Sequence, residues 1–339
     1  MTARTLIGIE GMISDDNTLK VKAARVQDEV VTDITPKNYN YKNLDLGREK
    51  ATITISVDSN PVLSRFIGLP PVDKKRIEEV TRYEARLQIP FDLDEVVTSC
   101  RVINYRPKEF KEIEVALFAM RKEYADFYAN CAREIGIKKP KLVPRVDSLN
   151  KVMGEQKGQE IVINIAQRDS DILIREPNNR YWIRSIPLGL FQLEKYSDKD
   201  RRETIMNDLS EEVIRSIGYY KTLSRDFIPE KMTILGGTQE YAEALSKLLL
   251  NYNVTIGHSL GNAKIPKGLE VAVGAALIGQ DKEINYFKEK VEINIPGESP
   301  YMRILSKTMK DLGDAAKNPF RTTGRALVSV GSRIERLGY

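Results

Sequence analysis

The most restrictive feature of this sequence is the order of elements that it predicts between residues 160 and 280. Alternating apolar residues and a turn on Pro177-Asn178-Asn179 predict three strands in an antiparallel meander, which a helical apolar pattern follows. The predicted elements are strands at 161–165, 171–174 and 180–186, a helix at 200–222, a strand at 231–235, a helix at 239–250, a short strand at 253–256 and an alanine-rich helix at 270–278. This order predicts a single α/β unit.

The composition is that of an ordinary soluble globular protein. At 339 residues the chain is long enough for two domains, and it is 41% hydrophobic and 30% charged. Residues 1–9 lack the pattern of a signal peptide, and no apolar stretch approaches the ~20 residues that span a bilayer, so we expect a cytoplasmic protein. Cys100 and Cys131 are expected to be buried thiols rather than a disulfide. A net charge of +5 is too small to indicate a nucleic-acid partner.

Several kinds of active site have no basis in the sequence. His258 is the only histidine, which argues against a multi-histidine metal site and a conventional Ser-His-Asp triad. The chain has no GxxxxGK[ST] phosphate loop and no GxSxG nucleophile motif. No pair of carboxylates stands out as general acid and base. We therefore predict no catalytic residue and no metal site.

The first half of the chain predicts further strands and two helices. The predicted elements are strands at 5–9, 19–31 and 61–67, a helix at 73–87, strands at 96–105 and 113–120, and a helix at 121–135, with an irregular loop at 35–50. The segment Lys151–Gln159 is polar and contains two glycines, which makes it the best domain boundary.

Three segments in this order resemble the PilM family of type IV pilus assembly proteins, an actin-like group related to FtsA. They are YEARLQIPFDLDEVV at 83–97, VALFAMRKE at 115–123, and RSIPLG at 184–189 followed by Leu235-Gly236-Gly237. The match is collinear over about residues 60–280. A buried amphipathic helix that ends at Pro90 would explain part of the first segment, but not the whole string.

The resemblance implies an α/β, actin-like ATPase fold with two ribonuclease-H-like halves and an inserted subdomain of the FtsA/PilM type. We accordingly expect a first half at 1–157 with the insertion at about 72–150, a second half at 158–283 and a basic extension at 284–339. The resemblance also implies a cytoplasmic scaffold, peripheral at the inner membrane, that binds the cytoplasmic tail of a PilN-like membrane protein. We expect the groove for that tail near Arg82, Tyr83 and Arg86.

The first phosphate loop of an ATP-binding actin-like protein is altered in this chain. Such a loop has the form DxGSxxxK directly after the first strand. Here Glu10 and Gly11 replace its start, Met12 stands where a glycine is expected, and Lys20 closes a longer turn. Glycines let backbone N–H groups approach phosphate closely, so we expect their loss to weaken binding.

The second phosphate loop has lost its aspartate and its glycine, to Asn164 and Ala166. A neutral amide is a poor ligand for magnesium, so we expect ATP and Mg²⁺ to bind weakly or not at all. Gly236, Gly237 and Thr238 resemble an adenosine-binding motif, although a tight strand-to-helix turn with an N-cap needs the same residues without a ligand.

Two further groups of charged residues remain open to more than one interpretation. Glu211, Glu212 and Arg215 on the long helix either face the nucleotide cleft or form a solvated helical face. From Tyr301 onward eight basic residues outnumber three acidic ones, and two amphipathic segments flank Pro319. A basic amphipathic helix can lie on anionic lipid, so residues 300–339 either contact the inner membrane, form a flexible tail or dock on a partner.

These observations leave three hypotheses. The first is a PilM-like scaffold of a type IV pilus or related secretion assembly, with a degenerate nucleotide site and no ATPase activity. The second is a functional ATP-binding actin-like protein whose loops are merely divergent. The third is an FtsA-like filament or membrane adaptor that is anchored by the basic extension.

Overall fold

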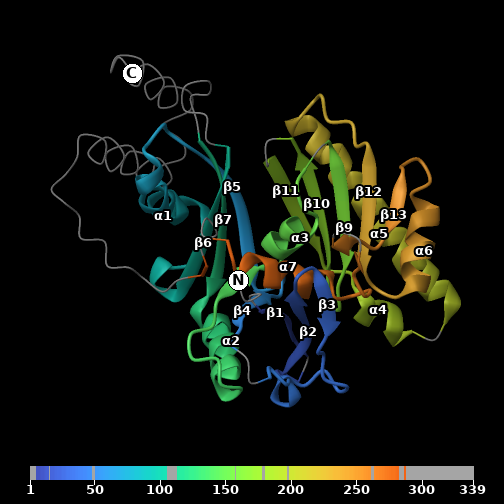
Figure 1. The fold of residues 1–339 in the computed structure, drawn as a ribbon. Helices are drawn as coiled ribbons and strands as arrows, with labels where there is room; N and C mark the ends of the chain where they lie inside the picture. The colour runs from blue at the N-terminus through green and yellow to red at the C-terminus, as the bar shows by residue number, and fades with distance from the viewer. Residues whose placement is uncertain are drawn as a thin grey trace, which may run out of the picture. The chain divides into compact units, whose positions relative to one another are not determined.

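Two five-stranded sheets with the same strand arrangement form the framework of the protein (Figure 1). The computed structural model describes residues 5–287, with gaps at 15, 48–49, 105–112, 157, 178–179, 197, 261–262 and 282–285. These residues belong to one unit, Met1–Lys290, and Val291–Tyr339 form a second unit, outside the described residues. The predicted extension at 284–339 therefore lies outside them as well, apart from Tyr286 and Phe287.

The first sheet has the strand order β3-β2-β1-β4-β8. Its strands are β1 Leu6–Ile13, β2 Leu19–Gln27, β3 Val30–Asp33, β4 Thr52–Val57 and β8 Leu142–Pro144. The first three pair as an antiparallel meander, whereas β4 runs parallel to β1, and β8 runs parallel to β4.

The second sheet, of order β11-β10-β9-β12-β13, repeats this pattern strand for strand. Its strands are β9 Glu160–Ile165, β10 Ser170–Glu176, β11 Arg180–Ile186, β12 Lys231–Gly236 and β13 Val254–Ile256. Again the first three form an antiparallel meander, and the last two run parallel to β9. The repeated topology confirms the predicted pair of ribonuclease-H-like halves.

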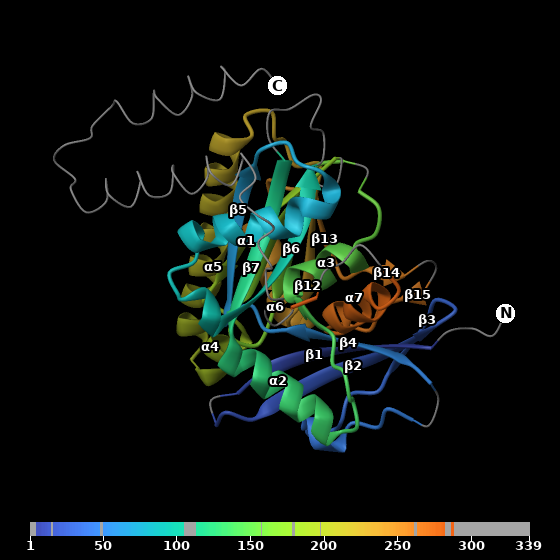
Figure 2. The same cartoon turned by 90° about the vertical axis from the view of Figure 1, so that its left-hand side faces the viewer.

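Helices α3 (Arg145–Val152) and α7 (Glu270–Ile278) lie between the two sheets (Figures 1 and 2). Their side chains share one hydrophobic core with residues of both sheets, among them Leu6, Val162 and Leu173. All but one residue of α7 is buried, which explains why its sequence is apolar on every side. Helix α7 follows the second half in the chain but contacts β1, β2 and β4 of the first.

Four further helices cover the outer faces of the two five-stranded sheets. Helices α4 (Leu190–Lys195), α5 (Lys199–Leu223) and α6 (Gln239–Leu248) form a core with the isoleucines of β9 and β10. Helix α2 (Lys122–Glu134) covers the first sheet, where Tyr128 packs in one core with Ile7 and Ile9. A short hairpin, β14 Ser259–Leu260 and β15 Ala263–Lys264, precedes α7.

A small sheet of order β5-β7-β6 is inserted between β4 and α2. It consists of β5 Val62–Leu69, β6 Val96–Asn104 and β7 Ile113–Arg121, together with helix α1 Ile77–Gln88. This sheet begins at Val62 and ends at Arg121, and so starts and finishes earlier than the 72–150 segment expected from the sequence. The reason is that α2 and β8 belong to the first five-stranded sheet and its core.

Several elements differ from the sequence-based expectation. Strands β4 and β8, helices α3 and α4 and the β14–β15 hairpin had not been predicted. The single strand expected at 19–31 is divided into β2 and β3, and the expected loop at 35–50 contains a 3-10 helix at Tyr41–Asn43. The two cysteines form no disulfide with each other: Cys131 is buried and Cys100 is half-buried. Among the described residues no helix combines the length and the apolarity needed to cross a bilayer.

Candidate functional site

A buried arginine lies where the two halves of the fold meet. Arg145 is the first residue of α3 and directly follows Pro144, which ends β8. Its side chain is only 1% exposed, which is unusual for an arginine and requires charged or polar partners. The sequence alone gave no indication of this residue.

Four carboxylates surround the guanidinium of Arg145. Its Nη1 donates to Asp169 Oδ1 at 2.5 Å and to Asp171 Oδ2 at 3.0 Å, and its Nη2 donates to Asp58 Oδ1. Its Nε lies 3.9 Å from Glu10 Oε1. All four acidic residues are buried. We refer to these five residues as the Arg145 cluster.

The Arg145 cluster draws its acidic residues equally from both halves. Glu10 lies on β1 and Asp58 directly follows β4, so these two belong to the first sheet. Asp169 lies in the turn between β9 and β10, and Asp171 lies on β10 of the second sheet. Because one guanidinium binds carboxylates of both sheets, it cross-links the halves directly.

The cluster holds more negative than positive charge, and burial and these charges together shift the pKa values of Arg145 and Asp169. Burial alone would lower the pKa of the Arg145 guanidinium, but the charges of Asp169, Asp171 and Glu10 outweigh that effect and raise it, so Arg145 stays protonated. Burial raises the pKa of Asp169, and the neighbouring charges of Asp171 and Glu10 add to the rise, against the opposing effect of Arg145. A proton on Asp169 therefore relieves part of the excess negative charge.

The pKa of Asp169 leads to a pH-dependent prediction for Asp169→Asn. A carboxyl whose pKa is raised by folding favours the folded state when protonated, and that contribution is lost as pH rises through its folded pKa. The unaltered chain should thus lose stability relative to Asp169→Asn as pH rises from about 4 toward neutral. Thermal unfolding of both proteins across this range tests the prediction, and a Tm of the unaltered chain that rises relative to that of Asp169→Asn with increasing pH would contradict it.

The predicted residues of the first phosphate loop are separated in the structure. Glu10 is part of the Arg145 cluster, but Gly11 faces α2, where an added Cβ would lie 2.6 Å from Tyr128 Cε1. Lys20 lies on β2, opposite Met12 of β1 and next to the β1–β2 turn. Hydrogen bonds lower the pKa of Asp16 at the tip of that turn, and the charge of Lys20 adds a smaller effect in the same direction.

The β1–β2 turn is itself poorly suited to phosphate. Asp16 Oδ1 accepts hydrogen bonds from the hydroxyls of Ser14 at 2.5 Å and Thr18 at 2.8 Å. The turn is thus closed by its own side chains and carries a carboxylate at its tip. A carboxylate in this position would repel a phosphate group.

The second phosphate loop is also closed by internal hydrogen bonds. The N–H of Ala166 donates to the carbonyl of Asp169, and two N–H groups at the start of α4 donate to the carbonyls of Ala166 and Gln167. Asn164 is buried, and its amide Nδ2 donates to Asp171 Oδ2 at 3.4 Å. Both predicted residues therefore support the turn and the Arg145 cluster.

Gly236, Gly237 and Thr238 form a turn that the fold itself requires. Both glycines have positive φ, +63° and +62°, and a Cβ on Gly236 would lie 2.8 Å from Asn164 Oδ1. Thr238 caps α6 by accepting a hydrogen bond from the N–H of Tyr241. This geometry fits the ligand-independent interpretation of these residues.

A pocket of about 300 Å³ adjoins the Arg145 cluster, because Asp58 belongs to both. Residues of the β1–β2 turn and of the β9–β10 turn line it, including Ser14, Asn17 and Arg168. The guanidinium of Arg145 lies beside Glu10 of the first predicted phosphate loop, and it shares Asp171 with Asn164 of the second. The Arg145 cluster therefore lies where the two predicted loops meet.

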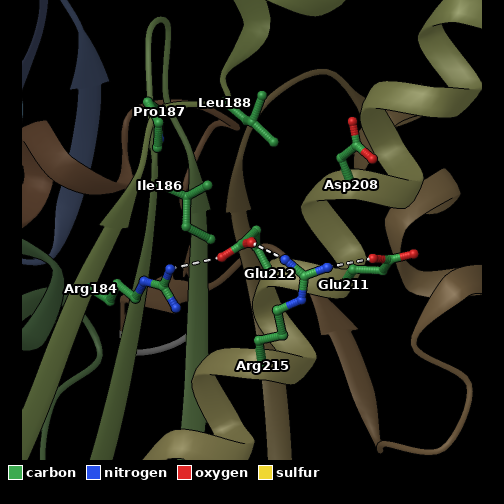
Figure 3. A pocket seen from close by; sticks show the side chains of 8 residues that line it. All are labelled: Arg184, Ile186, Pro187, Leu188, Asp208, Glu211, Glu212 and Arg215. Carbon is green, nitrogen blue, oxygen red and sulfur yellow. Dashed lines mark hydrogen bonds and ion pairs between the residues drawn. The ribbon is translucent and has the colours of Figure 1, made fainter.

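Glu211, Glu212 and Arg215 line a different pocket, of about 360 Å³, between α5 and the end of β11 (Figure 3). Arg215 pairs with both glutamates, and Glu212 also accepts a hydrogen bond from Arg184 at 2.8 Å. The residues that line this pocket include none of the Arg145 cluster. These charges therefore form a paired surface network, as the second of the two sequence interpretations proposed.

The residues expected to bind a partner lie on α1 of the inserted sheet. Tyr83 and Arg86 contact each other, with the guanidinium carbon 5.6 Å from the ring centroid. Arg86 is exposed, whereas Arg82 and Tyr83 are half-buried. Nearby apolar side chains are also exposed, including Leu87 at 50% and Phe91 at 36%.

Comparison with known proteins identifies the fold. A chain of the PilM-PilN type IV pilus biogenesis complex matches with a TM-score of 0.64 at 18% identity, over 81% of this chain and 98% of that one. The cytoplasmic domain of EpsL, an inner-membrane component of the type II secretion system of Vibrio cholerae, matches with a TM-score of 0.45 at 9% identity, over 80% and 94%. A Bacteroides thetaiotaomicron protein with an actin-like ATPase fold and unknown function matches with a TM-score of 0.44 at 10% identity, over 80% and 95%.

No family model and no curated protein matches the sequence. The structural likeness to the pilus complex, with a TM-score of 0.64, shows the fold, and it agrees with the three sequence segments that resemble PilM. The chain is PilM-like in architecture and has the actin-like fold.

Proposed function

We propose that this chain is a scaffold of a type IV pilus or related secretion assembly that binds the cytoplasmic tail of a PilN-like membrane protein without using ATP. The PilM-like segments of the sequence and the structural likeness to a PilM-PilN complex support the choice of partner. On this proposal the chain lies in the cytoplasm at the inner membrane, held there by its partner. The basic segment 300–339 would add an attraction to anionic lipid.

The absence of a nucleotide requirement rests on one observation, the position of Arg145. Its guanidinium and four carboxylates fill the site between the two phosphate loops, and a second cation and a triphosphate would have to displace them. The carboxylates would also repel the phosphates. The alternative of a functional ATP-binding protein lacks a comparable supporting observation.

Calorimetry with Mg-ATP tests this part of the proposal. We expect no binding by the unaltered chain, and none by an Asn164→Asp/Ala166→Gly variant, because Arg145 remains in the site of both proteins. An authentic ATP-binding actin-like protein, titrated in parallel, is the positive control. Micromolar binding by the unaltered chain would contradict the proposal and favour nucleotide-controlled partner exchange.

The partner is tested with a synthetic peptide of the cytoplasmic tail of a PilN-like protein. We expect binding that Mg-ATP does not alter, and at least a tenfold loss of affinity, about 1.4 kcal/mol, for Arg86→Glu. Arg86 is exposed, so its replacement should leave Tm unchanged. Arg215→Glu, on the exposed network of α5, is the matched control. Equal peptide affinities of the unaltered chain, Arg86→Glu and Arg215→Glu would mean that the groove does not involve Arg86. If the unaltered chain does not bind the peptide, the proposal of a PilN-like partner is wrong.

A further inference from the structure

A group of basic residues surrounds the C-terminal end of α2. We call this group the basic face, and it consists of Lys42, Arg133, Lys138, Lys139 and Lys141. Arg133 lies in the last turn of α2, and Lys42 lies in the 3-10 helix that α2 contacts (Figure 2). The other three lie in the connection between α2 and β8. All five side chains are exposed except that of Lys141, which is half-buried.

The positive charge of the basic face is only partly neutralised. Glu134 lies among these residues, but its carboxylate is 3.4 Å from Lys42 Nζ and accepts a hydrogen bond from the hydroxyl of Tyr41 at 2.5 Å. Lys138 and Lys139 take part in no ion pair among the described residues. Five cations thus accompany one carboxylate, and the face attracts anions.

The end of a helix explains only one of these residues. Basic side chains stabilise the C-terminal turn of a helix, and this accounts for Arg133. The effect falls off within that turn, whereas Lys138, Lys139 and Lys141 lie beyond it. Their concentration on one side of the first half therefore has another cause.

The chain leaves the described unit next to the basic face. Phe287 is the last described residue, and its N–H donates to the carbonyl of Leu142 at 3.0 Å. The ring centroid of Tyr286 lies 5.0 Å from Lys141 Nζ. The sequence that follows is itself basic from Tyr301 onward and contains two amphipathic segments. The folded unit is thus basic at the place from which this basic sequence continues.

Tyr39 adds an exposed aromatic ring beside the basic face. It lies three residues before Lys42, and it is 48% exposed. Its N–H donates to the carbonyl of Pro36, and its carbonyl accepts a hydrogen bond from the N–H of Val21, so the backbone that carries the ring is fixed to β2. A ring with a polar hydroxyl beside basic side chains suits the boundary between water and lipid headgroups.

We propose that the basic face lies on the surface of a membrane that contains anionic lipid. The negative potential of such a surface attracts lysine and arginine side chains, and the attraction adds up over the residues close to it. A lipid is favoured over an acidic protein because the sequence that continues from this place has basic amphipathic segments, which are typical of lipid-binding helices. The inference rests on the proposed location at the inner membrane and adds a direct contact of the folded unit with lipid.

Co-sedimentation of the full chain with lipid vesicles tests the proposal. One set of vesicles contains phosphatidylcholine alone, and the other contains phosphatidylcholine mixed with phosphatidylglycerol. We expect the unaltered chain to bind only the anionic vesicles, with an affinity that salt weakens. Lys138→Glu/Lys139→Glu should lower the vesicle partition coefficient about tenfold or more. Both residues are exposed, so this variant should keep the Tm of the unaltered chain.

A second double variant provides the matched control. Lys221→Glu/Lys247→Glu changes the net charge by the same amount at exposed lysines of α5 and α6, which cover the second sheet. We expect it to bind anionic vesicles as the unaltered chain does. Equal losses in the two double variants would overturn the proposal, because binding would then follow net charge alone.

Two other results would also overturn the proposal. If Lys138→Glu/Lys139→Glu binds vesicles as well as the unaltered chain, segment 300–339 accounts for lipid binding by itself. If the unaltered chain does not bind anionic vesicles but binds polyglutamate in a manner that Lys138→Glu/Lys139→Glu removes, the basic face binds an acidic protein. The vesicle assay contains no partner peptide, so a failure here and a failure of the proposed partner are observed separately.

Discussion

Replacement of Arg145 with alanine is expected to lower the free energy of unfolding by about 3–5 kcal/mol in buffer without divalent cations. The variant would keep four buried carboxylates and lose the guanidinium that pairs with all of them. Each unpaired buried charge must then be protonated or solvated, and either process favours the unfolded chain. Arg145 also connects the two halves, so the loss should reduce cooperativity between them.

Urea unfolding followed by circular dichroism measures this effect. Arg184→Ala is the matched control, because Arg184 also pairs with a carboxylate but has a 43% exposed side chain. We expect a change of about 0–1 kcal/mol for this exposed pair. Equal losses for the two variants would mean that the guanidinium of Arg145 contributes no more than a surface charge.

The second large effect is expected for Gly274→Ala in α7. An added Cβ would lie 1.9 Å from the carbonyl oxygen of Ser148 on α3, which no side-chain movement can relieve. Helices α3 and α7 would have to separate within the core shared by both sheets. We expect a loss of about 3 kcal/mol, at the upper end of the usual cost of overpacking.

Gly218→Ala distinguishes this steric effect from helix propensity. Gly218 lies inside α5, five residues before its last residue, and no atom outside the helix backbone lies within 4 Å of the Cβ that it would gain. Alanine is the better helix former, so this variant should gain about 0.5–1 kcal/mol. Chemical denaturation of both variants provides the comparison, and a stable Gly274→Ala would show that the two helices pack less closely than described.

The second half of the fold could be predicted closely because its signals are local. The sequence signals were alternating apolar residues, the turn at 177–179 and the Thr238 cap. They predicted the meander, β12 and α6 with bounds close to those observed. The first half was less predictable. Strand β4 lies beside a polar segment, and helix α3 is short, with a charged first residue and buried Asp147 and Ser148 that obscure its apolar stripe.

The candidate site was predictable only in part. Glu10 and Asn164 were placed near a common position by the family resemblance, and the structure brings both to the Arg145 cluster. The sequence patterns did not point to Arg145, Asp58 or Asp169. Each of them follows the end of a strand, where charged residues are common. Asp171 gave the one available signal, a carboxylate inside an apolar strand.

The sequence by itself determined the type and order of most elements, because helix and strand periodicities and turn residues act over a few neighbouring positions. It also showed Met12, Asn164 and Ala166 at positions where the two phosphate loops of an ATP site are expected to have a glycine, an aspartate and a glycine. Only the tertiary structure decided which residues meet between these two segments. Arg145 is 135 residues from Glu10 and 24 from Asp169 in the chain, and only the packing of α3 between two sheets brings the three charges together. Charge pairing of this kind depends on distances in space, which no local pattern encodes.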